Sequence, residues 1–419
     1  MTSPALPACP DLPGLPDFRS AAFLLGHVRD TLAFYERAGA LDPSGGFFHY
    51  FKDDGTVYDR RSRHLVSSTR FVFNHAMAFR RFGRPEDQAA ARHGLRFLHQ
   101  AHAQPQGGFA WTLDWDGERQ RASVTDGTNH CYGLAFVLLA HAHALMAGLD
   151  EARAGLDATW ALMEARFWEP DHGLYADEAT PDWQVGPYRG QNANMHGCEA
   201  MLAAFEATGE RRFLDRALTL AESITQRQAA LADGLVWEHY RSDWSVDWDY
   251  NRDDRTNIFR PWGYQTGHLT EWAKLLLQLE RQLLLHRPEA ERPDWLLPTA
   301  QRFFDTAMRH GWDAQHGGLV YGVAPGGAAC DADKYFWVQA ESLAAAAWLA
   351  QRSGDDAYWT WHDRIWAYSW AHFVDHRHGA WYRIRTPDNR AYSDEKSPAG
   401  KTDYHTMGAC WDVLKALGA

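Results

Sequence analysis

Six polar side chains recur at nearly the same distance behind a repeated glycine, and three of them are histidines. Five follow their glycine by 23 to 26 residues, and the sixth, His268, follows by 34 because a polar loop is inserted before it. The set comprises Arg70, Tyr132, His196, His268, Glu341 and His405. An imidazole with the ordinary pKa of about 6.5 can donate or accept a proton at neutral pH. His268 and His405 are therefore candidates for moving a proton on a carbon beside a carbonyl group.

Further polar residues have the spacing that places them on the same helix faces as these six. The groups are Asn192 with His196 and Glu199, His268 with Glu271, and Trp337 with Glu341. A cleft that combines planar polar groups with an indole suits a neutral polyol, because the polar groups bind hydroxyls and the indole covers the sugar face. The alternative is that these residues cap helices or form a buried polar seam, and it weighs most for Asn192 and Glu199 taken singly.

A sugar substrate would use both histidines. Its ring must open by proton transfer between the ring oxygen and O1, and a positioned base must then remove a proton from carbon. A neighbouring carboxylate raises the basicity of a histidine. The pair therefore predicts proton transfer between C1 and C2 of an aldose.

Other chemistries remain as alternatives. Metal-dependent isomerisation would need a tight cluster of ligands, and the candidate pairs, His268 with Glu271 and His196 with Glu199, come from different repeats. A glycoside hydrolase would use two carboxylates, which could be Glu271 and Glu341, or Asp403, but has less use for two imidazoles. A catalytically inactive protein that binds a peptide or glycan is the non-enzymatic alternative. No G-x-S-x-G motif, P-loop or dinucleotide fingerprint occurs in a suitable context.

The composition narrows the possible partners. The formal net charge is −12 and no basic run is present, which argues against nucleic acid or an anionic membrane surface. The five cysteines form no C-x-x-C pair and are odd in number, as expected for free thiols in a reducing compartment. We therefore predict a cytoplasmic protein, monomer or homodimer, whose partner is a small-molecule monosaccharide. No signal peptide or membrane-spanning run is recognisable.

The elements that must position these residues form six repeats. Each repeat has a turn with glycine and aromatic residues, read as a short hairpin, and then two helical stretches such as HGCEAMLAAFEATG and RRFLDRALTLAESITQRQ. The first helical stretch usually ends on a glycine. The intervals between lead glycines are 61 to 66 residues, apart from one of 83 that holds the inserted loop. The lead glycines are Gly45, Gly107, Gly173, Gly234, Gly317 and Gly379.

This repetition predicts an all-α fold, a single (α/α)6 barrel of six helical hairpins with short β-hairpins in the connecting loops. Closure into a ring would bring equivalent positions together around one axis, so the six polar side chains should meet in one pocket. An open solenoid of the same units is the alternative. No linker divides the chain, so residues 1–419 are predicted to form one catalytic domain, with a proline-rich N-terminal arm at residues 1–17.

Three segments resemble motifs of the N-acylglucosamine 2-epimerase superfamily, especially its aldose–ketose isomerase branch. YRGQNANMHGCEA (Tyr188–Ala200) resembles the R-G-x-N-x-N-M-H-x-x-E-A helix, and GHLTEW (Gly267–Trp272) resembles the G-H-x-x-E motif. KTDYH (Lys401–His405) resembles the segment that places the second catalytic histidine. The segments Ser68–Arg70 and Tyr132–Phe136 also fit, and the resemblance extends from about Gly45 to Leu417.

The resemblance implies roles for individual residues. His405 would take the C2 proton of the opened aldose and return it to C1 through a cis-enediol, and His268 would assist ring opening and move the proton between O1 and O2. Arg70 would polarise the oxygens of the enediolate. Tyr132, Asn192, His196, Glu271, Trp337 and Glu341 would bind hydroxyls or stack on the sugar, and the helical stripe adds Glu199. No metal or other cofactor would be required.

The implied activity is interconversion of D-mannose and D-fructose, and also of D-lyxose and D-xylulose. Trp272, directly after the G-H-x-x-E motif, resembles the isomerases more than the cellobiose epimerases. A sulfoquinovose isomerase is expected to have an extra arginine in the loop before that motif. Ile258 aligns there instead, with Arg260 two residues further on, which favours plain mannose. A sugar 2-epimerase acting on mannose, cellobiose or N-acylglucosamine remains the main alternative, because it shares the enediol step.

Overall fold

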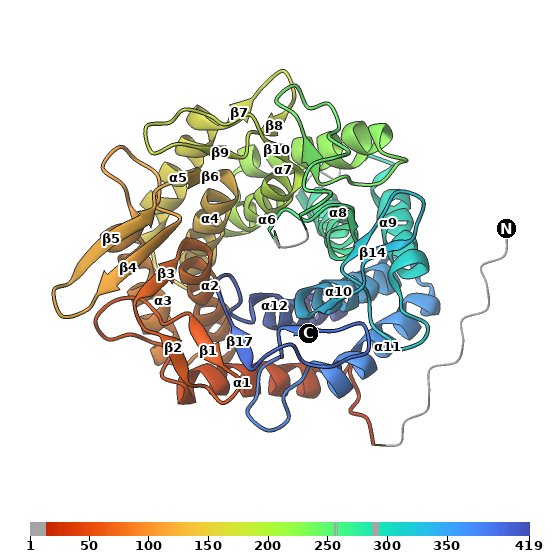
Figure 1. Ribbon diagram of the computed structural model, residues 1–419, viewed down its shortest axis with the longest axis horizontal. Helices are drawn as coiled ribbons and strands as arrows, with labels where there is room; N and C mark the ends of the chain where they lie inside the picture. Colours follow the sequence, from red (N-terminus) through yellow and green to blue (C-terminus); the bar gives the residue numbers. More distant parts are fainter. Residues whose placement is uncertain (1–13, 255–256, 258, 287–292) are drawn as a thin grey trace.

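The computed structural model describes residues 14–254, 257, 259–286 and 293–419. Six helices surround a central axis and six lie outside them (Figure 1). The inner helices are α2 (Leu65–Phe82), α4 (Cys131–Met146), α6 (Gln191–Thr208), α8 (Thr266–His286), α10 (Phe336–Ser353) and α12 (Tyr404–Leu417). The outer helices are α1 (Ala21–Arg37), α3 (Pro85–Phe97), α5 (Ala152–Arg166), α7 (Arg211–Glu222), α9 (Leu296–Gly311) and α11 (Asp356–His372).

The two ends of the chain close this ring. Each inner helix contacts the next, and α12 contacts both α10 and α2. The first helix, α1, packs against α12 and so completes the sixth helical pair. The (α/α)6 barrel predicted from the sequence is therefore confirmed, and an open solenoid is excluded. Residues 1–13, most of the predicted N-terminal arm, lie outside the described residues.

The inner helices are rich in alanine and leucine because they are covered on every side. In α10 the run Ala344–Ala347 is fully buried, and α4 is apolar around most of its circumference. The outer helices α7 and α9 bury one face only, as amphipathic helices do. The glycine ends predicted for the inner helices are confirmed where α2, α6 and α10 stop at Gly83, Gly209 and Gly354, each with a positive φ.

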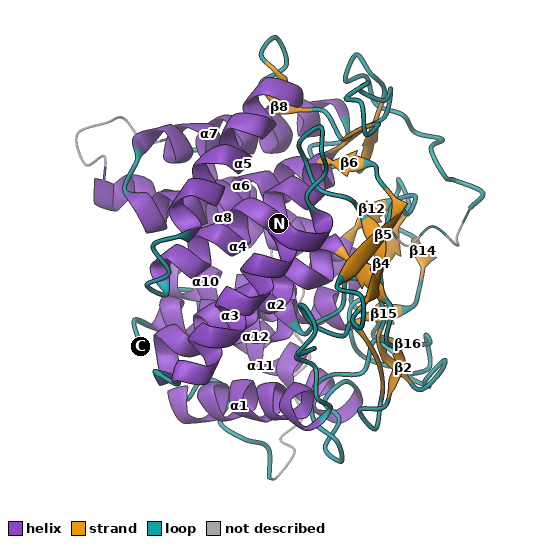
Figure 2. Ribbon diagram, turned by 90° about the vertical axis from the view of Figure 1, so that its left-hand side faces the viewer, coloured by secondary structure: helices purple, strands orange, loops and turns teal. Residues whose placement is uncertain are grey.

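Short strands connect successive repeats at one end of the barrel (Figure 2). The strand before each inner helix pairs with a strand in the loop of the following repeat, and the last pairs with the first. The pairs are β3 (Ser62–His64) with β4 (Thr112–Asp116), β6 (Asn129–His130) with β9 (Glu178–Ala179), β10 (Arg189–Gly190) with β11 (His239–Tyr240), β12 (Tyr264–Gln265) with β13 (Gly322–Val323), β15 (Lys334–Tyr335) with β16 (Ile384–Arg385), and β17 (Glu395–Ser397) with β1 (Tyr50–Lys52). These pairings fix where every inner helix begins.

The predicted hairpins form in four of the six repeats. Strands β1, β4 and β13 turn back into β2 (Val57–Asp59), β5 (Arg121–Asp126) and β14 (Ala329–Asp331), and β7 (Trp168–Glu169) pairs with β8 (Leu174–Tyr175). In the fourth and sixth repeats the chain turns back through single antiparallel bridges only, such as Tyr240 with Val246 and Arg385 with Ala391, while β11 and β16 pair with the preceding repeat. No helix among the described residues is both long and apolar enough to span a membrane.

Candidate active site

The inner helices present their polar residues at the strand-bearing end of the barrel, in two tiers. Tyr132, Asn192, Trp337 and His405 are the second residues of their helices and His268 the third. Arg70, His196, Glu271 and Glu341 are all sixth residues, about one turn deeper at a rise of about 1.5 Å per residue. The six residues at a nearly constant distance from their lead glycines therefore lie at two different depths in the barrel.

One cavity at this end brings eight of the ten predicted residues together. They are Arg70, Tyr132, Asn192, His196, His268, Glu271, Trp337 and His405. Glu199 and Glu341 are not among the residues that line it, so the geometry gives no support to their predicted role as sugar ligands. Loop residues complete the rim of the cavity, among them Phe259, Pro261, Arg383 and Gly400.

The two histidines of the upper tier are each held by a carboxylate. His268 Nδ1 lies 2.9 Å from Glu238 Oε2, and His405 Nδ1 lies 2.7 Å from Glu341 Oε1. A protonated Nδ1 donates to the carboxylate and leaves Nε2 as the acceptor, which fixes the tautomer. The indole of Trp337 lies close to both rings, with centroid distances of 5.0 Å to His268 and 5.8 Å to His405.

His405 is buried and neutral in this environment. Burial and then the positive charge of Arg70 lower its pKa, the hydrogen bond to Glu341 offsets part of this effect, and the resulting pKa is about 4. At neutral pH the ring is therefore almost entirely in the form that accepts a proton. Burial also lowers the pKa of His196, against the opposing effect of Glu199.

Arg70 is fixed by aromatic rings and by the last loop. Its guanidinium lies 4.4 Å from the ring centroid of Phe136 and 4.8 Å from that of Tyr404. One nitrogen donates to the Gly400 carbonyl at 2.5 Å and another approaches the Tyr132 hydroxyl at 3.3 Å. A guanidinium held in this way can stabilise negative charge that develops on a substrate oxygen.

Glu271 and Asn192 offer polar atoms that nothing in the described structure satisfies. Both carboxyl oxygens of Glu271 and Oδ1 of Asn192 are buried without a hydrogen-bond partner, and both residues line the cavity. Burial and the neighbouring Glu341 raise the pKa of Glu271 well above its usual value. Its protonated carboxyl can both donate to and accept from hydroxyl groups, as recognition of a polyol requires.

Glu199 and Glu341 lie one layer behind the cavity. Glu199 accepts a hydrogen bond from His196 Nδ1 at 2.8 Å and another from the Tyr404 hydroxyl. Glu341 holds His405 and forms an ion pair with Lys274 at 2.6 Å. Both carboxylates therefore orient cavity residues, which spacing along one helix could not reveal.

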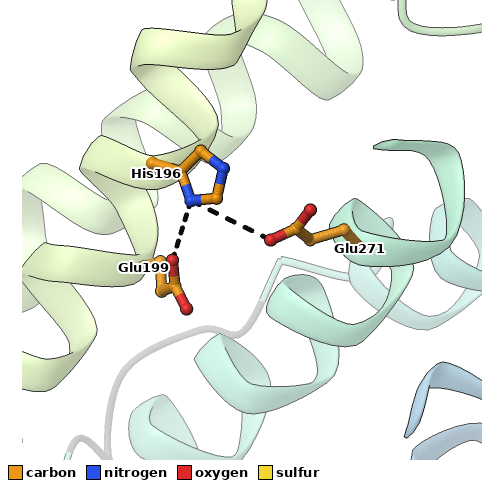
Figure 3. Close-up of side chains that lie close together, drawn as sticks. All are labelled: His196, Glu199 and Glu271. Carbon is orange, nitrogen blue, oxygen red and sulfur yellow. Dashed lines mark hydrogen bonds and ion pairs between the residues drawn. The ribbon is translucent and has the colours of Figure 1, made fainter. Parts of the chain in front are cut away.

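Two groups of side chains place potential metal ligands close together. In the first, His196 Nδ1 faces Glu199 at 2.8 Å and Glu271 of α8 at 3.9 Å (Figure 3). The second comprises Glu271, Glu341 and His405. In the first group His196 Nδ1 is hydrogen-bonded to Glu199, and in the second His405 Nδ1 is hydrogen-bonded to Glu341. These hydrogen bonds show that each of the two histidines is oriented by a carboxylate.

Two residues that hold the candidate histidines in place, one directly and one through Glu341, were missed by the sequence analysis. Glu238 follows β-type sequence in the fourth repeat, 30 residues before His268, and Lys274 lies one turn beyond Glu271. Nothing in the spacing connects Glu238 with His268, because the inserted loop separates them. Lys274 could have been noticed as a lysine directly before the apolar run Leu275–Leu277 of an inner helix.

The residues proposed for other chemistries lie elsewhere. Asp403 is fully buried and accepts hydrogen bonds from Tyr35 and Lys401, each at 2.7 Å, so it holds the last loop in place. Arg260 forms an ion pair with Glu178 at 2.6 Å and is not among the cavity-lining residues. Ile258 lies outside the described residues. The geometry thus favours neither Asp403 as a glycosidase carboxylate nor Arg260 as a sulfonate ligand.

Comparison with known proteins gives matches over almost the whole chain. The family model for N-acylglucosamine 2-epimerase (GlcNAc 2-epimerase) matches residues 46–409. A D-mannose isomerase from Marinomonas mediterranea is 52% identical over 404 residues, which cover 96% of this chain and 99% of the relative. A D-mannose isomerase from Thermobifida fusca is 37% identical, with 84% of each chain covered.

A solved structure is similar to the same extent. The crystal structure of a D-mannose isomerase has a TM-score of 0.91 and 52% sequence identity, and the match covers 96% of this chain and all of that one. The arrangement of helices described above is therefore shared with an experimentally determined structure.

Proposed function

Since the chain belongs to the N-acylglucosamine 2-epimerase family, we propose that it is an aldose–ketose isomerase that interconverts D-mannose and D-fructose. The observation that carries this proposal is the pair of carboxylate-bound histidines, His268 and His405, which line one cavity and both contact Trp337. The identity with D-mannose isomerases over nearly the full chain supports the choice of sugar. D-Lyxose, which has the configuration of D-mannose at C2 and C3, and its ketose D-xylulose are further candidate substrates.

In the proposed reaction His268 opens the sugar ring. Its Nε2 exchanges a proton with the oxygens at C1 and C5, while Glu238 holds Nδ1 and stabilises any positive charge on the ring. The open chain then exposes an aldehyde at C1 with an acidic C–H at C2. Trp337 lies beside the reacting end and covers one face of the sugar.

His405 then transfers the proton between carbons. Its neutral Nε2 removes the proton from C2, and the electron pair moves into a C1–C2 double bond as charge develops on O1. Arg70 stabilises this oxygen and His268 moves a proton from O2 to O1. His405 returns its proton to C1, which gives the ketose, and Glu341 compensates the transient charge on the imidazolium.

The remaining cavity residues bind the rest of the sugar. Tyr132, Asn192, His196 and Glu271 also line the cavity and supply donors and acceptors for hydroxyl groups. Glu199 acts through His196, whose ring it orients. We further propose that the protein works in the cytoplasm as a monomer or homodimer, as predicted from its composition.

The test is product analysis with purified protein. We expect mannose to give fructose in the presence of a chelator, measured by sugar chromatography. Glucose as the only product would identify a 2-epimerase, and turnover that needs added metal would contradict the mechanism. In D₂O, deuterium at C1 of fructose is expected from exchange at His405. Release of the aryl group from aryl glycosides would instead favour a glycoside hydrolase.

A further inference from the structure

A second cavity, of about 360 Å³, lies behind the sugar-binding cavity. Its lining extends from the exposed Arg80 and Arg81 at the end of α2 to the buried Lys274 and Glu341. The layer between the two cavities is thin, because His405 lines the front one and its partner Glu341 lines the rear one. Solvent at the rear can therefore approach the group that orients the proposed base.

Lys274 occupies this layer and has no part in the reaction steps proposed above. Its side chain is 5% exposed, and its ammonium lies 2.6 Å from Glu341 Oε2 and 3.0 Å from Asp412 Oδ2. A buried ammonium is unfavourable unless it is paired and hydrogen-bonded. Burial alone would lower the pKa of Lys274, but Asp412 and Glu341 raise it well above its usual value. The residue is therefore charged and fixed by two carboxylates.

Glu341 depends on this ammonium for its own charge. Burial would raise its pKa, whereas Lys274 and then His405 lower it to about 2. Several charged or titratable groups face this region from neighbouring helices. They are Arg70 on α2, His196 and Glu199 on α6, Glu271 on α8, and Asp412 on α12. Without Lys274, four carboxyl groups would share this space, and Glu341 could ionise only at a higher pH.

We infer that Lys274 is a positioning residue for the isomerisation: its ammonium, reached from the rear cavity, holds the Glu341 carboxylate against His405 Nδ1. This inference rests on the proposed function. A carboxylate in that place selects the tautomer whose Nε2 accepts a proton, whereas a displaced or protonated Glu341 does not. The effect is transmitted to the reaction entirely through His405, because Lys274 does not line the sugar-binding cavity.

The first experiment compares Lys274→Met with Lys415→Met. Lys415 also lines the rear cavity but pairs with Glu206, at 2.6 Å, so it serves as the matched control. We expect Lys274→Met to lower kcat at least roughly tenfold, the order found for partners that orient a reactive imidazole, with KM within about threefold. Lys415→Met should keep the wild-type kcat. A Lys274→Met enzyme with more than about half of the wild-type kcat would overturn the inference.

The pH profile separates this role from a general loss of structure. Removal of the ammonium takes a positive charge away from the hydrogen-bonded pair of Glu341 and His405, so both groups take up a proton at higher pH and the acidic limb of log kcat should move up by about one unit or more. An unshifted limb with a lowered kcat would contradict the inference. If Lys274→Met fails to fold, the double variant Lys274→Gln/Asp412→Asn also removes the Asp412 charge that would be left unpaired. We expect this variant to show the same fall in kcat and the same shift of the acidic limb.

Rescue from the rear gives an independent measurement. Lys274→Ala leaves space next to Glu341, and methylammonium can enter through the rear cavity and donate to the carboxylate. We expect methylammonium to raise kcat of this variant at least about fivefold, with no effect on wild type and no rescue by tetramethylammonium, which has no N–H to donate. Equal responses to the two cations would reject the inference. Failure of the proposed function is distinct, because it appears as a wild-type enzyme that makes no fructose.

Discussion

Replacement of His405 by Asn is expected to abolish isomerisation and to leave the barrel folded. The pKa of about 4 makes His405 almost wholly neutral at pH 7, so nearly every molecule has a competent base that the substitution removes. General base catalysis contributes roughly 10²–10⁴-fold, which corresponds to about 3 to 5 kcal/mol of the barrier. We therefore expect kcat to fall by at least about a hundredfold.

The structure also indicates that the variant survives as a folded protein. Glu341 loses the donor on His405 but keeps the ammonium of Lys274 at 2.6 Å, so no carboxylate is left unpaired. The loss of one buried hydrogen bond costs about 1–3 kcal/mol, against roughly 5–15 kcal/mol of total stability. A cooperative thermal transition by circular dichroism, a few degrees below that of wild type, is the expected result.

The assay measures fructose formed from mannose at pH 7, with His143→Asn as the matched control. His143 also belongs to an inner helix but lines the rear cavity, outside the site. The control should stay close to wild-type activity. If His405→Asn keeps more than about a tenth of the wild-type rate, His405 is not the base and the assignment of roles to the two histidines is wrong.

Three further predictions concern the same cavity. Glu238→Gln should lower kcat roughly 10- to 100-fold, because an amide can also donate to His268 Nδ1 and favour the wrong tautomer; an unchanged kcat would contradict this. Trp337→Ala should raise KM for mannose about two- to tenfold, the equivalent of one aromatic contact, and Trp337→Phe should recover most of it. NMR titration of His405 should give a midpoint near 4, because burial disfavours its charged form; a midpoint near the usual 6.5 would show that the ring is hydrated.

The ring could be predicted from the sequence because its repeats have a local physical cause. Five of the six lead glycines adopt a φ between 60° and 93°, a conformation that other residues rarely take, so the turn chemistry is visible in every copy. The pairing of α1 with α12 could not be read in the same way. It joins the two ends of the chain, and no local pattern in residues 21–37 indicates which helix they cover.

The site was predicted in part, for a reason of helix geometry. Counting from the lead glycine identified Arg70 and His405 correctly as cavity residues, but it also selected Glu341, which lies at the same depth as Arg70 yet behind the ring of His405. The position of a residue along its helix does not show which side chains of the neighbouring helices cover it, so spacing alone cannot separate a ligand of the sugar from a partner of the base. Glu238 is contributed by another repeat and became visible only in three dimensions.

The depth of the carboxylates is what favours an isomerase over a hydrolase on this barrel. A two-carboxylate glycosidase needs both acids in contact with the scissile bond, whereas here Glu341 and Glu238 each bond to a histidine Nδ1, and the imidazoles stand between Glu341 and the cavity. The acids thus orient the two imidazoles, and the neutral His405 suits removal of a proton from carbon near neutral pH. The same barrel could serve other reactions. The function therefore follows from which side chains line the cavity and which lie behind them.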